Sequence, residues 1–330
     1  MSDSANLERL LSALAYIPAE DRETWLHVGM ALKHELGDDG FPHFDAWSEK
    51  SENYNARDVA AVWRSFREAG KVTAGTLYHY AKAHGWKSDL PPDPDRLKRQ
   101  RLAAERAAVD AALRAKDRAR AAALARTLWS AGGRVRAHPY LVRKQVSPSD
   151  TLRELSGETM RSLLGYTPKQ GGVGLSGPVL LAPVKIAGAL STLELIDEAG
   201  RKSALRGGAK KGGYWASGAL GATIAIGEGI ATALTISAAL AASAVASLSC
   251  TNLLPVAIYL RSRYPLARIM VCGDLGNGQR DAEKAALAVG GICVVPDFGP
   301  DRPDGATDFN DLQCLDGLEA VRRQLEDACS

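Results

Sequence analysis

Residues 271–286, VCGDLGNGQRDAEKAA, contain the strand-to-helix transition that decides the fold. An apolar run ends at Cys272–Gly273, Asp274 follows at once, and glycines then precede a polar, alanine-rich stretch. This pattern predicts a buried strand, a tight turn and a helix, with one carboxylate at the end of the strand. Asp274 is therefore either a ligand of a metal ion or only a turn former and helix cap.

The same alternation extends over residues 221–330. Four short apolar runs, rich in β-branched residues, alternate there with stretches of helical periodicity. This predicts an α/β domain, with a parallel four-stranded sheet and flanking helices. In such sheets the active site lies at the carboxyl ends of the strands.

Acidic residues follow three of the four predicted strands. Glu228 follows the first and Asp274 the third, and an acidic loop follows the fourth. The acidic residues of that loop are Asp297, Asp301, Asp304, Asp308 and Asp311. A single acidic residue in such a place is commonly a helix cap. Because clustered carboxylates repel one another, three acidic strand ends at one rim favour a bound hard cation, Mg²⁺ or Mn²⁺.

Composition limits the remaining possibilities. The 330 residues are enough for two or three domains, and 46% of them are hydrophobic, as in soluble globular proteins. The formal net charge is +3, so affinity for nucleic acid must come from local patches. No stretch is long and apolar enough to span a membrane, the first residues lack a signal-peptide pattern, and the five cysteines form no CxxC pair. We expect a reduced, cytoplasmic protein without a zinc site and without a membrane partner.

Residues 1–88 are predicted to form a small all-helical domain, because four stretches with helical apolar spacing are separated by polar loops. Four of the six tryptophans lie in this segment or at its edge. They are either core aromatics or residues that stack on bases. Trp47, in the loop-like stretch 44–58, is the best candidate for stacking on single-stranded DNA.

Residues 89–131 are predicted to be a proline-rich linker followed by a basic helix. Between Arg96 and Arg126 there are ten lysines and arginines against three acidic residues. The charges either form a solvated helix face or bind a phosphate backbone.

Residues 132–220 are predicted to form a mixed α+β subdomain. Residues 137–146 and 151–166 are expected to be short helical or loop pieces, and residues 177–207 three strands with a hairpin turn at DEAG, 197–200. The following loop, RGGAKKGGYW at 206–215, combines glycines with Arg206, Lys210 and Lys211. It is either a phosphate-binding loop or a plain surface hairpin.

Three motifs resemble a known family. IAIGEGIATALTI (224–236), IMVCGDLGNGQRDAEKAA (269–286) and GATDFNDL (305–312) resemble, in order and spacing, the Toprim domain of DnaG-like primases, topoisomerases and some nucleases. The pattern is most similar to the Toprim primases of plasmids, phages and integrative elements. Residues 6–87 resemble the helical accessory domain of mobile-element primases.

The resemblance implies roles for individual residues. Glu228 would be a general acid/base or a carboxylate near the metal, and Asp274 would hold Mg²⁺ with help from Asp308 and Asp311. Basic residues fall where the family binds template and nucleotide: Arg143, Lys144, Arg206, Lys210 and Lys211. The sequence departs from the family motif at Gly276, which stands where the second aspartate is expected and puts a second metal ion in doubt.

The implied function is that of a DNA primase, a nucleotidyltransferase that makes short RNA primers on single-stranded DNA from ribonucleoside triphosphates. It would serve the replication of a mobile genetic element. No P-loop motif is present, so a separate replicative helicase or initiator is the expected partner. Two alternatives remain at this stage, a Toprim nuclease and a catalytically degenerate Toprim protein that only binds nucleic acid.

Overall fold

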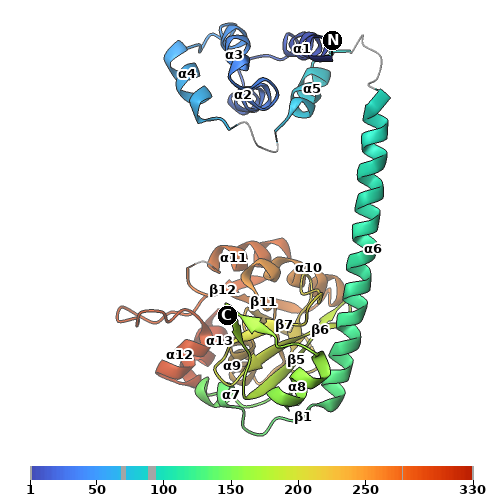
Figure 1. Cartoon of the computed structure of the whole chain (residues 1–330). Helices are drawn as coiled ribbons and strands as arrows, with labels where there is room; N and C mark the ends of the chain where they lie inside the picture. Colours follow the sequence, from blue (N-terminus) through green and yellow to red (C-terminus); the bar gives the residue numbers. More distant parts are fainter. Residues whose placement is uncertain (1, 68–71, 88–93, 277, 329–330) are drawn as a thin grey trace. The chain divides into compact units, whose positions relative to one another are not determined.

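The computed structural model (Figure 1) describes residues 2–67, 72–87, 94–276 and 278–328. The chain folds as two compact units, residues 1–104 and 105–330. Of the proline-rich stretch 88–96, predicted from the sequence to be a linker, residues 88–93 lie outside the described residues.

The first unit is helical, as predicted. Its elements up to residue 87 are α1 (Ser2–Leu14), α2 (Arg22–Leu36), a 3-10 turn (Gly37–Gly40), α3 (Phe41–Ser48), α4 (Ala56–Ser65) and α5 (Ala74–Ala83). Side-chain caps fix where helices begin. Asp21 accepts a hydrogen bond from Thr24 N (2.8 Å) before α2, and Asn55 accepts one from Arg57 N (3.0 Å) before α4.

The tryptophans form the core of this unit, and the expectation that Trp47 stacks on DNA is wrong. Trp47 is 2% exposed, and its indole N–H donates to the carbonyl of Ile17 (2.8 Å). Its ring packs against Phe44, which also contacts Trp25 and Trp63. The stretch 44–58 looks like a loop because it is polar, but its first five residues complete α3, and the aromatic face of that helix turns inward.

The basic stretch forms the long helix α6 (Pro94–Ala131), as predicted. In the second unit its carboxyl-terminal part packs through Ala121, Ala125 and Leu128, all fully buried. Their partners include Val179 and Leu193 of an antiparallel sheet. The other side chains of α6 from residue 104 to 120 are exposed.

The antiparallel sheet has the strand order β1–β2–β5–β6–β7. Its strands are β1 (Gly133–Arg134), β2 (Arg153–Ser156), β5 (Pro178–Ile186), β6 (Ala189–Asp197) and β7 (Lys202–Ala204). Two helices, α7 (Pro139–Arg143) and α8 (Gly157–Leu164), and a small hairpin, β3 (Lys169–Gln170) with β4 (Val173–Gly174), complete this part. The sequence predicted β5, β6 and β7 but not β2, because RELS is too short and too polar to show strand alternation.

The second sheet has the order β12–β11–β9–β10–β8. Its strands are β8 (Trp215–Ala216), β9 (Thr223–Gly227), β10 (Ala244–Ala246), β11 (Arg268–Cys272) and β12 (Ile292–Val294). The four predicted strands, β9 to β12, pair in parallel, which confirms the α/β class, and β8 adds an antiparallel edge.

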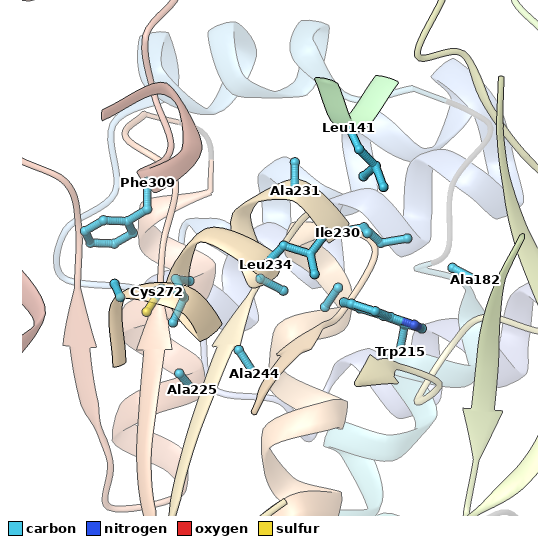
Figure 2. Packing of buried hydrophobic residues seen from close by; sticks show 14 of the residues in the cluster. Leu141, Ala182, Trp215, Ala225, Ile230, Ala231, Leu234, Ala244, Cys272 and Phe309 are labelled. Carbon is cyan, nitrogen blue, oxygen red and sulfur yellow. The ribbon is translucent and has the colours of Figure 1, made fainter. Parts of the chain in front are cut away.

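Helices cover both faces of this sheet (Figure 1). Those that follow its strands are α9 (Ile230–Leu240), a 3-10 turn (Cys250–Asn252), α10 (Leu253–Arg263), α11 (Gln279–Ala288), α12 (Phe309–Asp316) and α13 (Leu318–Asp327). The α10 and α11 helices pack on one face. On the other face α9, α12 and α13 share a core with the antiparallel sheet, where Trp215, Leu234 and Phe309 lie (Figure 2). This shared core fixes the two sheets relative to each other.

Among the described residues, none of the helices combines the length and the apolar character that crossing a membrane requires.

Candidate active site

Glu228 and Asp274 lie at the carboxyl ends of neighbouring parallel strands. β9 and β11 are paired, with Ile226 opposite Val271. The chain runs from β9 to β10 on one side and then crosses to β11 on the other, so the strand order reverses between β9 and β11. Ligands of open α/β sheets bind at such a reversal.

A cavity of about 110 Å³ opens at this point. Its lining residues are Glu194, Ile196, Lys202, Glu228, Gly229, Ile230, Leu248, Asp274 and Asp308. Glu228, Asp274 and Asp308 come from the parallel sheet and its loops, whereas Glu194 and Lys202 come from the antiparallel sheet. The candidate site is thus built by both sheets.

Asp274 is the least satisfied of these carboxylates. Its Oδ1 is buried and has no hydrogen-bond partner. Burial raises the pKa of Asp274 to about 7, with further contributions from the charges of Glu228 and Asp308. A buried, unpartnered carboxylate oxygen is destabilising unless a proton or a cation neutralises it.

Glu228 shares this environment. Burial raises its pKa above the ordinary value, partly offset by the ammonium of Lys202. The backbone carbonyl of Glu228 accepts a hydrogen bond from Leu248 N (2.8 Å), which ties the end of β9 to the segment after β10.

Asp308 and Asp311 are held by other groups. Asp308 caps α12, and its Oδ2 accepts from the hydroxyl of Thr232 in α9 (3.1 Å). Asp311 Oδ1 pairs with Lys144 Nζ (3.2 Å), and its Oδ2 accepts from Thr307 N (3.0 Å). Asp308 lines the cavity and Asp311 does not.

The rest of the acidic loop is separate from the site. Asp297, Asp301 and Asp304 are exposed and line none of the cavity. The third acidic strand end therefore contributes Asp308 alone to the cavity.

The conformation of the turn after Asp274 explains why a glycine stands where the family motif has its second aspartate. Gly276 has φ = +91°, a conformation that side chains other than glycine rarely adopt. An aspartate at position 276 would strain the backbone. The local geometry therefore favours a motif with Asp274 as its single aspartate.

The predicted basic residues do not form one group. Lys210 Nζ pairs with the buried Glu194 (2.7 Å) next to the cavity, and Lys211 is exposed on the same loop. Arg206 lies on the ring of Tyr166, with 4.7 Å from its guanidinium carbon to the ring centroid. The other two are Arg143, which donates to the carbonyl of Glu198 (3.0 Å), and Lys144, which pairs with Asp311.

Two charged lining residues were missed by the sequence reasoning, Glu194 and Lys202. Glu194 is 4% exposed within an apolar strand, and that placement of a charged residue was the available signal. Lys202 begins the short strand β7 and gave no signal of its own.

The donor set fits one hard cation with few protein ligands. In the described part of the chain, no three acidic, histidine or cysteine side chains are arranged as a closed metal site. Mg²⁺ commonly uses one or two carboxylates and completes its shell with water and substrate phosphates. Asp274, with Glu228 or Asp308 beside it, supplies such a partial set.

Comparison with protein families agrees with this geometry. Residues 223–319 match the family model described as "Toprim domain", and residues 7–81 match "Primase C terminal 2 (PriCT-2)".

Solved structures of primases are similar at low identity. A DnaG primase catalytic domain bound to ssDNA is 15% identical (TM-score 0.44; 64% of this chain and 80% of that chain covered). The RNA polymerase domain of Mycobacterium tuberculosis DnaG is 17% identical (0.40; 63% and 83%). The primase fragment of the bacteriophage T7 primase-helicase protein is 15% identical (0.37; 59% and 81%). Similarities this distant support no inference about activity.

The parallel sheet with Glu228 and Asp274 at its reversal point thus lies in the part of the second unit that matches the Toprim domain, residues 223–319. The PriCT-2 match lies in the helical first unit, so the two matched domain types follow each other along the chain in the order PriCT-2, then Toprim.

Proposed function

We propose that this chain is a DNA primase, which joins ribonucleotides on a single-stranded DNA template by metal-dependent nucleotidyl transfer. The observation that supports this most directly is the buried, unpartnered Oδ1 of Asp274, beside Glu228, in a cavity that Lys202 also lines. The match of residues 7–81 to a primase-associated domain favours a primase over other Toprim enzymes.

In this reaction the 3′ hydroxyl of one ribonucleotide attacks the α-phosphorus of the next, and pyrophosphate leaves with the electrons of the broken P–O bond. Asp274 would hold the cation, assisted by Glu228 or Asp308. When bound, Mg²⁺ or Mn²⁺ would supply positive charge next to the phosphate oxygens. Lys202 adds a cation to the cavity from the antiparallel sheet.

Glu228 is suited to accept the proton of the attacking hydroxyl. Burial raises the pKa of Glu228, so this pKa lies closer to neutral pH than that of an exposed glutamate. A general base works best when its pKa lies near the operating pH. Lys210 holds Glu194 in an ion pair (2.7 Å), and the charge of the Lys202 ammonium lowers the pKa of both Glu228 and Asp274 against the larger rise from burial.

Single-stranded DNA and ribonucleoside triphosphates are the proposed substrates. Because duplex DNA must be opened before a primer can be made, we propose that a separate replicative helicase or initiator acts together with this chain. Service to a mobile genetic element stays a prediction from the sequence resemblance.

The test is to incubate the full chain with single-stranded DNA, labelled ribonucleoside triphosphates and Mg²⁺ or Mn²⁺. A primase yields short labelled oligoribonucleotides, and Asp274→Asn abolishes them. Shortening of an end-labelled DNA strand without RNA synthesis would instead show a nuclease. DNA binding with neither product would show a Toprim protein without catalysis.

A further inference from the structure

A buried asparagine outside the cavity connects the two sheets that build it. Asn252, which directly precedes α10, is 5% exposed and does not line the cavity. Its amide nitrogen donates to the carbonyl groups of Ser247 (2.6 Å), Lys210 (3.2 Å) and Gly213 (2.8 Å). Its amide oxygen accepts a hydrogen bond from Gly212 N (2.7 Å). Three of these four partners belong to the loop that follows β7, so Asn252 holds this loop to the parallel sheet.

The segment that carries Asn252, residues 247–252, also holds Glu228. Leu248 N donates to the backbone carbonyl of Glu228 (2.8 Å). Burial raises the pKa of Glu228, and a hydrogen bond from the backbone N–H of Cys250 to its carboxylate offsets part of this rise. The segment therefore fixes both the backbone and the carboxylate of Glu228.

The loop held by Asn252 is also tied to the antiparallel sheet. Lys210 Nζ pairs with Glu194 of β6 (2.7 Å), and Glu194 lines the cavity. Ser191 Oγ, in the same strand, donates to the carbonyl of Ala209 (2.8 Å). The hydrogen bonds of Asn252 therefore connect the cavity residues of one sheet with those of the other.

Backbone strain occurs in the same segment. Leu248 lines the cavity and has φ = +70°, which is rare for a residue other than glycine. Its neighbour Ser247 is held on both sides, because its N–H donates to the carbonyl of Gly227 (2.9 Å) and its Oγ donates to that of Ser249 (3.0 Å). Strain of this kind persists only where the surrounding structure imposes it, and it is concentrated at functional sites. The segment therefore holds one defined geometry beside the cavity.

We infer that Asn252 is a positioning residue for the reaction in the cavity. It sets the position of Glu228 relative to the wall that carries Glu194, and it acts through the backbone of the loop. That this reaction is nucleotidyl transfer rests on the proposed function, whereas the link between the sheets does not. Asp274 and Asp308 lie in other segments of the parallel sheet and its loops, so loss of Asn252 leaves them in place.

The test compares Asn252→Ala with wild type in primer synthesis and in Mn²⁺ titration, at a temperature where circular dichroism shows both to be folded. We expect kcat to fall by about 10- to 100-fold, since a misplacement of about 1 Å can cost about 100-fold. The Mn²⁺ affinity should stay within about twofold of wild type, because sites that share no partner act independently. A purely structural defect would instead lower kcat and Mn²⁺ affinity together, and that result would contradict the inference.

Asn252→Asp separates the hydrogen bonds from packing. It keeps the volume of the side chain and the acceptor for Gly212 N, but it loses the donors to the three carbonyl groups. We expect it to lower kcat about as far as Asn252→Ala does. Wild-type kcat in Asn252→Asp would show that these donors position nothing and would overturn the inference.

A double-mutant cycle tests whether Asn252 acts through the loop. Lys210→Met breaks the ion pair with Glu194 and so releases the same loop from the cavity wall. Because both changes act on one loop, the double variant should lose less kcat than the product of the two separate losses. Separate losses that multiply would show that the two side chains act independently, against the inference.

Arg261→Ala is the matched control. Arg261 lies in α10, nine residues after Asn252, and it too donates to three backbone carbonyl groups. These belong to Val289 (2.8 Å), Pro265 (3.0 Å) and Ala267 (2.7 Å), and Arg261 does not line the cavity. Its loss should lower the melting temperature, as that of Asn252 does, because buried carbonyl groups lose their donors. We expect kcat of Arg261→Ala to stay within about twofold of wild type.

Hydrogen exchange of residues 206–215, followed by mass spectrometry, reports the loop without any need for activity. In Asn252→Ala this stretch should exchange about tenfold faster or more, as loss of its hydrogen bonds allows, and in Arg261→Ala it should not change. Unchanged exchange in Asn252→Ala would overturn the inference, and so would a loss of kcat in Arg261→Ala equal to that in Asn252→Ala. If wild type makes no primers, the proposed function fails, and the exchange of this stretch alone decides whether Asn252 positions the loop.

Discussion

Asp308 and Asp311 form a reciprocal capping box at the start of α12. Asp308 Oδ1 accepts a hydrogen bond from Asp311 N (2.8 Å), and Asp311 Oδ2 accepts one from Asp308 N (3.4 Å). This reciprocal capping box fixes the start of α12 and places Asp308 in the cavity. The two aspartates therefore differ in position, because Asp308 lines the cavity and Asp311 does not.

We expect Asp311→Ala to lower stability more than it affects metal binding. It removes the capping bond and the ion pair with Lys144, and loss of a capping side chain costs about 0.5–2 kcal/mol. Thermal melts and Mn²⁺ titration of the same variant separate the two effects. A variant with wild-type melting but no Mn²⁺ binding would assign Asp311 to the metal after all.

Glu228→Gln and Asp274→Asn should each reduce primer synthesis by about 100-fold or more, since each removes a charge at the reacting phosphate. Asp301→Asn is the control, because Asp301 is exposed and outside the cavity. Initial rates of labelled RNA synthesis give the comparison. Full activity in Asp274→Asn with an unchanged melting temperature would exclude Asp274 from catalysis.

The stability of the metal-free protein should depend on pH through Asp274. Its pKa is about 7 in the folded chain against an ordinary value of 3.8. Between these values the folded chain keeps a proton that the unfolded chain releases, so stability falls as pH rises and the full cost is present above about pH 7. The raised pKa lowers the free energy of unfolding by at most about 4 kcal/mol.

Asp274→Asn removes this cost. We therefore expect the variant to melt at a higher temperature than wild type at pH 8 in EDTA, with little difference at pH 4. Melting curves at both values, followed by circular dichroism, provide the measurement. Equal melting temperatures at pH 8 would show that the carboxylate is better solvated than its burial indicates.

The sequence was sufficient to predict the parallel sheet because its strands are continuous apolar runs separated by helices of clear periodicity. It also led to Glu228 and Asp274, since both follow such runs directly. It did not assign Lys202 and Glu194 to the site, because they reach the cavity from an antiparallel sheet whose packing against the parallel sheet is set by contacts distant in sequence. Trp47 was the best candidate for base stacking because its polar surroundings look like a loop, and of the two interpretations left open by the sequence, its burial favours the core aromatic.

The division between the PriCT-2 domain and the rest of the chain can be tested directly. All residues of the first unit's hydrophobic core, from Leu10 to Trp86, lie before residue 88. We therefore propose that residues 1–88 fold alone, and that limited proteolysis of the full chain cuts near residues 88–96. A helical fragment that melts cooperatively is the expected result, and an unfolded fragment would contradict the boundary.

Gly276 provides the sharpest test of how the cation is held. Its φ of +91° makes any L side chain strained, although open space surrounds the position. Gly276→Ala and Gly276→Asp should therefore both lose stability, by about 1–3 kcal/mol. Backbone strain at this position is present with and without the cation, so the difference between the Mn²⁺ affinities of the two variants reports the added carboxylate.

If one cation binds at Asp274, the extra charge in Gly276→Asp should tighten Mn²⁺ binding relative to Gly276→Ala, since affinity for a hard cation rises with the charge of its ligands. Calorimetric titration with Mn²⁺ measures this difference, and thermal melts in EDTA measure the strain. Equal Mn²⁺ affinities in the two variants would place the cation away from this turn. Two tightly bound ions in the nucleotide-free wild type would show that another carboxylate replaces the missing aspartate.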